Sequence, residues 1–421
     1  MKVLWFSNTS ANAVEHLKEG PVGGGWLKSL DKALQQKVEL HIAFYFPKRN
    51  ESFKYLDTTY HPISKGNWRL KAVLGLFWSR IVYQQDFLKY LNIINLVNPD
   101  IIHIHGTENP FGYIISKINI PVVVSIQGCM TVYHHKFLSG FTKKNLSVSI
   151  WHRGKGLKQF IRKKSFNRSL KEFEKKKTRE QQNLKFTSYI IGRTAWDRRI
   201  TSVLAPDRVY YHCDELLRDA FYKHIWEYNG GRKKLVIQTT NSNSPYKGFE
   251  TICETLHILN TIKDIQIEWQ VAGISSGDSI VRVTRNKLKH KFPESGLIYL
   301  GNLNENKLVE LLCKAQIYVS PSHIENSPNS LCEAMILGLP CIATFAGGTG
   351  SLLKDGEEGI LIQDGDPWAL AGAIIELYNN PTLANQYGRN ARERALKRHD
   401  PDKVVKSYID VYNDIIKRYQ I

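Results

Sequence analysis

Two successive series of apolar runs, each run followed by a helix-prone segment, constrain the fold of this chain more than any other feature. The runs are short and rich in Val, Ile and aromatic residues, which is typical of buried strands. Strands that alternate with helices form parallel sheets covered on both faces. The sequence therefore predicts an α/β protein, with strands at 2–7, 38–46, 99–106 and 121–128, strand-to-helix segments at 186–197 and 208–217, and then strands at 234–240, 265–273, 296–303, 315–322, 340–344 and 359–362.

The length of 421 residues exceeds what one hydrophobic core usually organises, and this favours two domains. We expect two Rossmann-like, doubly wound domains whose strand carboxyl ends face each other across a cleft. The first is predicted at 1–225 and the second at 232–400, with a linker at Gly230 and Gly231. Residues 401–421 are predicted to form a helix that returns to the first domain.

Positive charge is concentrated in residues 141–185, which carry fifteen Lys or Arg against three Glu, within a chain of net charge +19. Such a segment attracts phosphates of nucleic acid, anionic lipid or a lipid diphosphate, although a solvated helix face is the alternative. The six cysteines form no C-x-x-C pair and no run is long and apolar enough to span a bilayer. We expect a cytoplasmic protein, peripheral on the inner face of the membrane if it associates with one at all.

The segment SPSHIENSPNSLCEAMILGLP contains a helix start at Ser327 and Pro328. The serine hydroxyl is suited to cap free amides, and proline fits the first turn without losing a needed donor. The amides of Asn329, Ser330 and Leu331 would then point out of the helix end. A free helix end offers donors and a positive dipole to an anion, so a diphosphate is the predicted ligand here.

Glu325 and Glu333 flank that helix start with seven residues between them, which resembles family 4 of the retaining glycosyltransferases, of the bacterial cell-surface polysaccharide type. The resemblance implies the two-domain GT-B fold and a nucleoside-diphosphate sugar as donor. It also implies that Glu325 contacts the donor sugar and that Glu333 binds the ribose. The alternative is an ordinary capped helix with two solvated glutamates.

Lys247 and Gly248 in NSNSPYKGFETI match the Lys-Gly of the same family. Breaking the bond from sugar to phosphate leaves negative charge on the nucleotide, and a fixed cation with a helix dipole stabilises that charge. The resemblance therefore implies no metal and no cofactor besides the donor. A surface lysine beside a turn glycine is the alternative.

The chain departs from the family at Ser242, where an arginine usually stands five residues before the lysine. Arg193 follows an apolar strand and is the predicted replacement, projecting from the first domain into the cleft. A structural ion pair within the first domain is the alternative for Arg193.

Further donor contacts are implied by the resemblance in both domains. In the first domain, the Gly24-Gly25 turn would lie under the donor phosphates, while Gln127 stands where many relatives carry histidine. His134 is a further candidate for sugar or acceptor contact. In the second domain, the backbone wall that reads the nucleobase would be built from Gly273, Asn302 and Leu303.

The predicted function is a retaining, metal-independent transfer of a sugar to an acceptor hydroxyl, in the synthesis of cell-surface polysaccharide or glycolipid. A nucleotide-sugar epimerase or another GT-B enzyme is the first alternative, and a basic nucleic-acid-binding protein is the second. No recognised nucleic-acid-binding module is present in the sequence, so nucleic acid is not the expected partner. We expect a glycan or lipid-linked acceptor, and contact with anionic membrane through Trp151, Phe160 and Phe166 of the basic segment.

Overall fold

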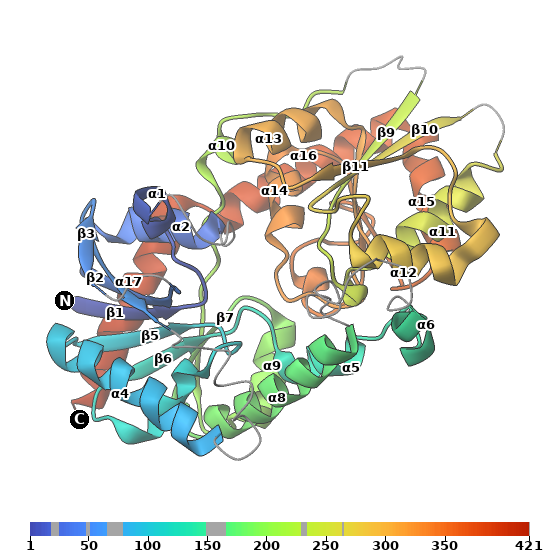
Figure 1. Ribbon diagram of the computed structural model, residues 1–421. Coiled ribbons are helices and arrows are strands. Elements are labelled where there is room, and N and C mark those ends of the chain that lie inside the picture. Colours follow the sequence, from blue (N-terminus) through green and yellow to red (C-terminus); the bar gives the residue numbers. More distant parts are fainter. Residues whose placement is uncertain are drawn as a thin grey trace. The chain divides into compact units, whose positions relative to one another are not determined.

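The computed structural model describes residues 1–17, 25–47, 51–64, 79–148, 166–228, 234–262 and 265–420 (Figure 1). Contacts within the chain divide it into two compact units. Unit 1 comprises residues 1–131, 176–217 and 399–421, and unit 2 comprises residues 132–175 and 218–398.

The sheet of unit 1 has the strand order β3-β4-β2-β1-β5-β6-β7-β8 among the described residues. All neighbouring strands pair in parallel except β3 and β4, which form an antiparallel hairpin at one edge. The sequence interpretation missed this hairpin because its short runs lie in a polar stretch. The strands are β1 (Lys2–Ser7), β2 (Glu39–Tyr45), β3 (Phe53–Tyr55), β4 (Thr58–Ile63), β5 (Ile101–His105), β6 (Val122–Ser125), β7 (Tyr189–Gly192) and β8 (Val209–His212).

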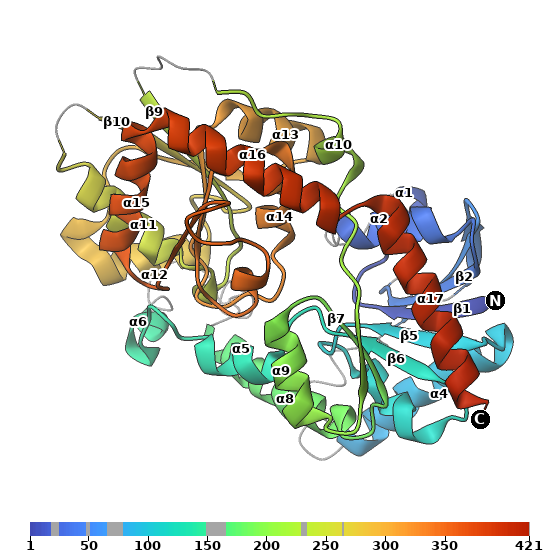
Figure 2. The same cartoon turned by 180° about the vertical axis from the view of Figure 1, so that it is seen from behind.

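Helices pack on both faces of this sheet. On one face, α2 (Gly25–Leu34) and α17 (Pro401–Tyr419) share a core with β1 and β2 that includes Trp5 and Tyr408. Figure 2 shows α17, in red, running along this unit, to which residues 399–421 belong. The other face is covered by α4 (Ser79–Val97) and the 3-10 helix η1 (Pro110–Lys117). The remaining helices are α1 (Ala13–Leu17), α9 (Ala195–Leu204), and α5 (Met130–Lys136) and α8 (Phe166–Leu184), which continue across the unit boundaries.

The sheet of unit 2 has the order β11-β10-β9-β12-β13-β14, and every pairing in it is parallel. In chain order within the unit this is 3-2-1-4-5-6, the doubly wound arrangement of Rossmann-like domains. The direction of winding therefore reverses between β9 and β12. The strands are β9 (Lys234–Thr240), β10 (Gln266–Ala272), β11 (Leu297–Gly301), β12 (Ile317–Ser320), β13 (Cys341–Thr344) and β14 (Ile360–Ile362).

The helices of unit 2 fall into two layers (Figure 1). One layer joins α11 (Phe249–Leu259), α12 (Ser279–Leu288) and α15 (Pro367–Asn379), which pack with Trp269 and Ile317 of the strands. The other joins α10 (Asp219–Tyr222), α13 (Glu305–Lys314), α14 (Asn329–Leu337) and α16 (Pro381–Arg398). The shorter helices are α6 (Lys143–Val148), η2 (Pro245–Lys247), η3 (Lys289–Lys291) and η4 (Thr349–Ser351).

The division of the chain differs from the predicted domains in the basic segment and at the boundary predicted near residue 225. Residues 132–175 lie in unit 2, although the prediction placed the basic segment 141–185 within a first domain of residues 1–225. The reason is apolar packing, since Phe137, Phe141 and Phe166 belong to the core that includes α11 and α12. The change of unit falls between residues 217 and 218, and the predicted linker at Gly230 and Gly231 lies outside the described residues.

This packing corrects one membrane prediction. Phe166 is buried in the core of unit 2 and is not available to a lipid surface. Trp151 and Phe160 lie outside the described residues. Among the residues that are described, no helix has both the length and the apolar content required to cross a membrane.

Candidate functional site

The reversal of winding in unit 2 defines where a ligand site is expected. In doubly wound sheets, ligands bind outside the carboxyl ends of the strands at the point where the strand order reverses. Here that point lies between β9 and β12, so the two loops that follow these strands, 241–248 and 321–328, flank it. These loops contain Lys247 and Glu325, the two residues predicted to be catalytic.

Lys247 and Glu325 contact each other directly. The Lys247 ammonium donates to Glu325 Oε1, and Ser322 Oγ donates to the same oxygen at 3.0 Å. Burial lowers the pKa of Lys247 while Glu325 raises it, and the net direction is upward. The structure thus brings together two side chains that are 78 positions apart in sequence, and it holds the lysine in its charged form.

The two loops are fastened to each other by backbone geometry. Gly248 has a φ of 71°, and a Cβ at this position would overlap with the carbonyl oxygen of Pro321. The amide of His323 donates to the carbonyl of Tyr246 at 2.8 Å, and Asn241 Nδ2 donates to the Lys247 carbonyl at 3.0 Å. Gly248 therefore serves close packing of the two loops, and this fixes the position of Lys247.

The helix end lies next to these loops but begins one residue later than predicted. α14 starts at Asn329, and Pro328 occupies the cap position without a side-chain cap hydrogen bond. The amide of Leu331 donates to the Pro328 carbonyl at 3.0 Å, which removes it from the predicted set of free donors. Among the described residues, no backbone carbonyl is recorded as an acceptor for the amides of Asn329 and Ser330. These two donors and the helix dipole remain for an anion.

Glu333 lies one turn into α14, on the same face as Asn329 and Ser330. Its two carboxylate oxygens accept hydrogen bonds from Arg218 Nε and Nη2, each at 2.7 Å. Burial raises the pKa of Glu333, and Arg218 offsets part of that rise. Arg218 escaped the sequence interpretation because it stands 115 positions before Glu333, in a segment without a recognisable motif.

A second buried polar cluster supports the loop that carries Glu325. The two ring nitrogens of His323 contact Glu250 and Asp364, the latter at 3.2 Å. Burial lowers the pKa of His323, but the two carboxylates raise it above the usual value. Lys136 lies 3.6 Å from Asp364. The sequence contained one usable signal for this cluster, since His323 stands two residues before Glu325.

The predicted nucleobase wall is partly assembled. The amide of Gly273 donates to the carbonyl of Gly301 at 2.7 Å, so the ends of β10 and β11 lie side by side. Gly273 has a φ of 83°, and a Cβ there would overlap with the carbonyl of Asn241. Asn302 is exposed and Leu303 is half-buried. Backbone groups of Gly273 and the side-chain amide of Asn302 thus lie just after the carboxyl ends of β10 and β11.

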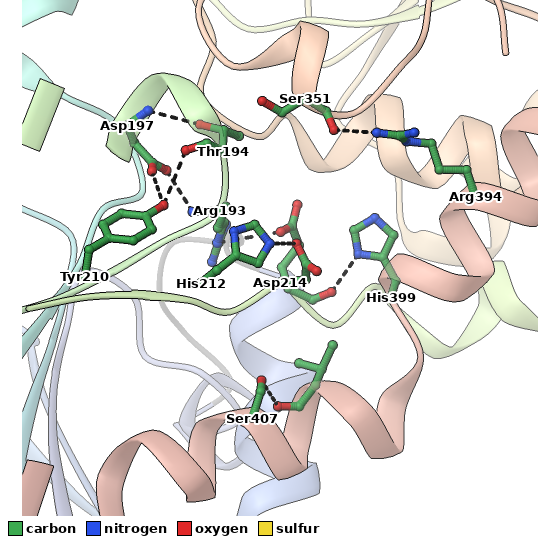
Figure 3. Close-up of polar contacts among 12 residues, drawn as sticks. Arg193, Thr194, Asp197, Tyr210, His212, Asp214, Ser351, Arg394, His399 and Ser407 are labelled. Atoms are coloured by element: carbon green, nitrogen blue, oxygen red, sulfur yellow. Dashed lines mark hydrogen bonds and ion pairs between the residues drawn. The ribbon is translucent and has the colours of Figure 1, made fainter. Parts of the chain in front are cut away.

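Arg193 is engaged within unit 1 (Figure 3). Its Nε lies 3.6 Å from Glu215 Oε2, both side chains are buried, and the guanidinium stacks 4.1 Å from the ring of Trp26. Burial lowers the pKa of Arg193, but Glu215 raises it, and the net direction is upward. The surroundings favour the structural ion pair over the second phosphate-binding cation that was predicted to replace the arginine missing at Ser242.

The remaining predicted site residues are Gln127, His134 and the Gly24-Gly25 turn. Gln127 follows β6 and is half-buried, and His134 lies in α5 with its ring 5.8 Å from that of His135. Gly25 is the first residue of α2, whereas Gly24 lies outside the described residues. None of the described contacts brings these residues to Lys247.

Comparison with known proteins finds a family match within unit 2. Residues 223–394 match the family model described as Glycosyl transferases group 1. The matched region includes Lys247, Glu325 and the whole of α14, and it excludes Arg218 and all of unit 1.

A curated relative, N-acetyl-alpha-D-glucosaminyl L-malate synthase of Bacillus anthracis, is 29% identical over 130 residues, which are 31% of this chain and 34% of the relative. The chain spans about half or less of the length of the curated relatives that it matches.

Solved structures resemble the whole chain. Sucrose-phosphate synthase from Thermosynechococcus elongatus has a TM-score of 0.73 at 14% identity, covering 99% of this chain and 100% of its own. Anabaena HepE in complex with UDP-glucose has a TM-score of 0.64 at 14% identity, covering 98% of this chain and 100% of its own. At such identity the likeness concerns the fold, which is GT-B. The comparisons therefore show a chain with the GT-B fold, in which residues 223–394 are similar to the group 1 glycosyl transferases.

Proposed function

We propose that this protein transfers a sugar from a nucleoside-diphosphate sugar to an acceptor hydroxyl with retention of the anomeric configuration. The observation that carries the proposal is the contact between Lys247 and Glu325 at the winding reversal of the second sheet. A cation with two helix-end amides and two carboxylates there match the three parts of such a donor, which are its diphosphate, its sugar and its ribose. Lys247 and the amides of Asn329 and Ser330 bind the diphosphate, Glu325 orients the sugar, and Glu333 binds the ribose.

The chemical step follows from these roles. The bond between the anomeric carbon and the phosphate oxygen breaks, and its electron pair stays on the leaving diphosphate. The acceptor oxygen forms the new bond on the same face, and its proton passes to a leaving phosphate oxygen. An ammonium has three hydrogens, so Lys247 can keep its bond to Glu325 while it donates to a phosphate. The leaving charge is thus stabilised by protein groups, and we propose that no metal is required.

The nature of the donor is supported from two directions. The matched family consists of glycosyl transferases, and one protein of the same fold was solved with UDP-glucose. The choice of base and sugar depends on the loops after β10 and β11, where Gly273, Asn302 and Leu303 lie.

For the acceptor, we propose a glycan or lipid-linked intermediate of cell-surface polysaccharide or glycolipid synthesis. The resemblance of the Glu325 to Glu333 motif to enzymes of that type supports this, as does the positive charge of residues 141–185. Such a charge would hold the protein at an anionic membrane surface on the cytoplasmic side. Sedimentation with anionic and with neutral liposomes tests this part, and equal recovery with both would contradict it.

The test of the proposed function begins with a thermal-shift screen of nucleoside-diphosphate sugars. A ligand at 100 times its Kd stabilises the folded state by about 2.7 kcal/mol. The true donor should therefore raise the melting temperature more than the other sugars in the screen. With that donor, release of the nucleoside diphosphate and the anomeric configuration of the product are then followed. Glu325→Ala and Lys247→Ala should remain folded by circular dichroism and lose transfer by orders of magnitude. Turnover near that of the wild type in either variant would refute these roles.

A further inference from the structure

Arg218 and Glu333 form the most completely paired ion pair of the proposed donor site. Both hydrogen bonds are 2.7 Å long and they form the parallel, two-bond arrangement in which arginine binds carboxylates most strongly. The guanidinium also lies 4.7 Å from the ring centre of Phe221, so it is held on a second side. Arg218 directly precedes α10, and this short helix packs against both α13 and α14. The pair therefore joins α10 to the first half of α14.

The carboxylate keeps hydrogen-bonding capacity after this pairing. An ionised carboxylate has about four acceptor positions, and the guanidinium takes one on each oxygen. Two positions remain, on a side chain that shares its helix face with the amides of Asn329 and Ser330. A vicinal diol presents two hydroxyl donors at matching spacing. The hydroxyls of a ribose attached to a diphosphate at the helix end fit this requirement.

The charge of Glu333 depends on Arg218. α10, α16, β12 and β13 pack against α14; Arg218 and Asp219 lie at the start of α10, α16 contributes Arg392, and β12 and β13 carry no charged residue. Glu305 of α13 also acts on Glu333 through its charge. Burial and Glu305 both raise the pKa of Glu333, and Arg218 lowers it. Arg392 bonds the carbonyl of Ile336 near the far end of the helix. Arg218 is thus the group that opposes protonation of this carboxylate.

We propose that Arg218 is a positioning residue for the ribose of the donor: it holds Glu333 ionised and oriented so that the carboxylate accepts hydrogen bonds from the 2′ and 3′ hydroxyls. This rests on the proposed function, because it assumes that Glu333 faces a ribose. It adds a residue outside the matched family region, which begins at 223, and it makes selection of ribose over deoxyribose depend on a residue that does not touch the nucleotide.

The experiment compares the affinity for a ribonucleoside 5′-diphosphate with that for its 2′-deoxy counterpart. The base is the one that stabilises the wild type most in the thermal-shift screen. A hydrogen bond to a charged group contributes about 1.5–3 kcal/mol, so the wild type should prefer the ribonucleotide by roughly 10-fold to 100-fold. Isothermal titration calorimetry from about pH 6.5 to about pH 9 gives the two Kd values for each variant.

The variants distinguish a role of Arg218 in positioning Glu333 from a role in the stability of the fold alone. The preference for the ribonucleotide is the ratio of the two Kd values. In Arg218→Met this ratio should fall towards 1 at the acid end of the pH range, where Glu333 becomes protonated, and recover towards the alkaline end, where Glu333 ionises again. Arg218→Lys should restore the preference at all pH values, in part. Glu333→Gln should lose the preference for the ribonucleotide at every pH. The double variant Arg218→Met with Glu333→Gln should show the same preference as Glu333→Gln alone. Lys287→Met is the matched control, because Lys287 pairs with Glu254 at 2.9 Å in the same unit and is 26% exposed, against 22% for Arg218.

Two results would overturn the inference in different ways. If Arg218→Met lowers the melting temperature but leaves the preference as in the wild type at every pH, Arg218 is only a structural link between α10 and α14. If no ribonucleoside diphosphate binds the wild type, the proposed function fails, and the assignment of Arg218 fails with it.

Discussion

Both units contain a parallel sheet whose strand order reverses once near its middle, but the polar residues at the two reversals are used differently. In unit 2, loops 241–248 and 321–328 bring Lys247 to Glu325, beside a helix end with two amides that have no described backbone acceptor. In unit 1 the reversal lies between β1 and β5, and the polar residues there bond to one another: Asn109 Nδ2 donates to Asn8 Oδ1 at 2.7 Å, and Asn8 donates to Glu108. The same topology thus supports a site with open hydrogen-bonding capacity in one unit and an internally paired network in the other.

The difference shows that topology fixes where a site can form, while the local residues decide whether one does. The matched family region lies within unit 2, which agrees with this reading. Four predictions test it. The substitution in unit 1 should affect the free energy of unfolding and not the donor, whereas those at Lys247 and Glu325 in unit 2 should affect mainly the reaction.

The largest effect is expected from Arg193→Met in unit 1. Removing the guanidinium leaves the buried Glu215 carboxylate without its counter-ion, which should lower the free energy of unfolding by about 3–5 kcal/mol. Chemical denaturation measures this loss. The folded variant should bind the donor as the wild type does, because the pair lies within unit 1. A loss of donor affinity at unchanged stability would instead assign Arg193 to the donor and break the comparison.

Next in size is the coupling between Lys247 and Glu325 in the reaction. Lys247→Met and Glu325→Gln should each lower turnover by about 10²-fold to 10³-fold, as removal of one preorganised charge-stabilising group does. The double variant should lose less than the product of the two, because the residues contact each other. Initial rates of nucleoside-diphosphate release give all three values. Lys287→Met, a lysine of similar exposure paired in the same unit, should keep the wild-type rate, and strictly multiplicative effects would contradict a shared site.

A smaller effect is expected from Gly248→Ala. Its φ of 71° costs other residues about 1–2 kcal/mol, and the added Cβ overlaps with the Pro321 carbonyl, so the loops must separate. Both stability and donor affinity should fall. Gly277→Ala is the control, since a Cβ at Gly277 meets no atom within 4 Å. Equal behaviour of the two variants would show that close packing of the loops does not position Lys247.

The smallest effect is the pH dependence contributed by His323. Its pKa is raised in the folded state by Glu250 and Asp364, so its stabilisation is fully present below about pH 6.5, the value for an unfolded histidine, and is lost as pH rises through the folded value. The slope from this one proton cannot exceed about 1.4 kcal/mol per pH unit. The free energy of unfolding of the wild type should therefore decline over that range more steeply than that of His323→Gln. If the free energy of unfolding changed with pH equally in the two proteins, His323 would not stabilise the loop that carries Glu325.

The sequence predicted those features that depend on residues close to one another along the chain. Runs such as KLVIQTT and AQIYVSPS become β9 and β12 because a continuous apolar run is stable only when it is buried on both sheet faces. The position of Lys247 and Glu325 could be predicted because each stands in a loop directly after such a strand.

The features that could not be predicted depend on contacts between distant residues. The pairing of Arg218 with Glu333 and of His323 with Glu250 leaves no periodic pattern in the sequence. The assignment of residues 132–175 to unit 2 was equally hidden, because Phe137 and Phe166 show only that they are apolar, and not which core they join. The predicted helix start, with Pro328 in the first turn, was one residue early, because sequence signals for a helix start do not define a single residue.

The interleaving of the two units along the chain has a consequence for synthesis. Unit 1 needs residues 399–421, which are translated after all of unit 2, whereas unit 2 is complete once residue 398 has emerged. Domains generally fold as units as they are made, with the N-terminal one first. Here the order is reversed, since the strands translated first must wait for α17 to cover Trp5, while the half translated later can already be folded.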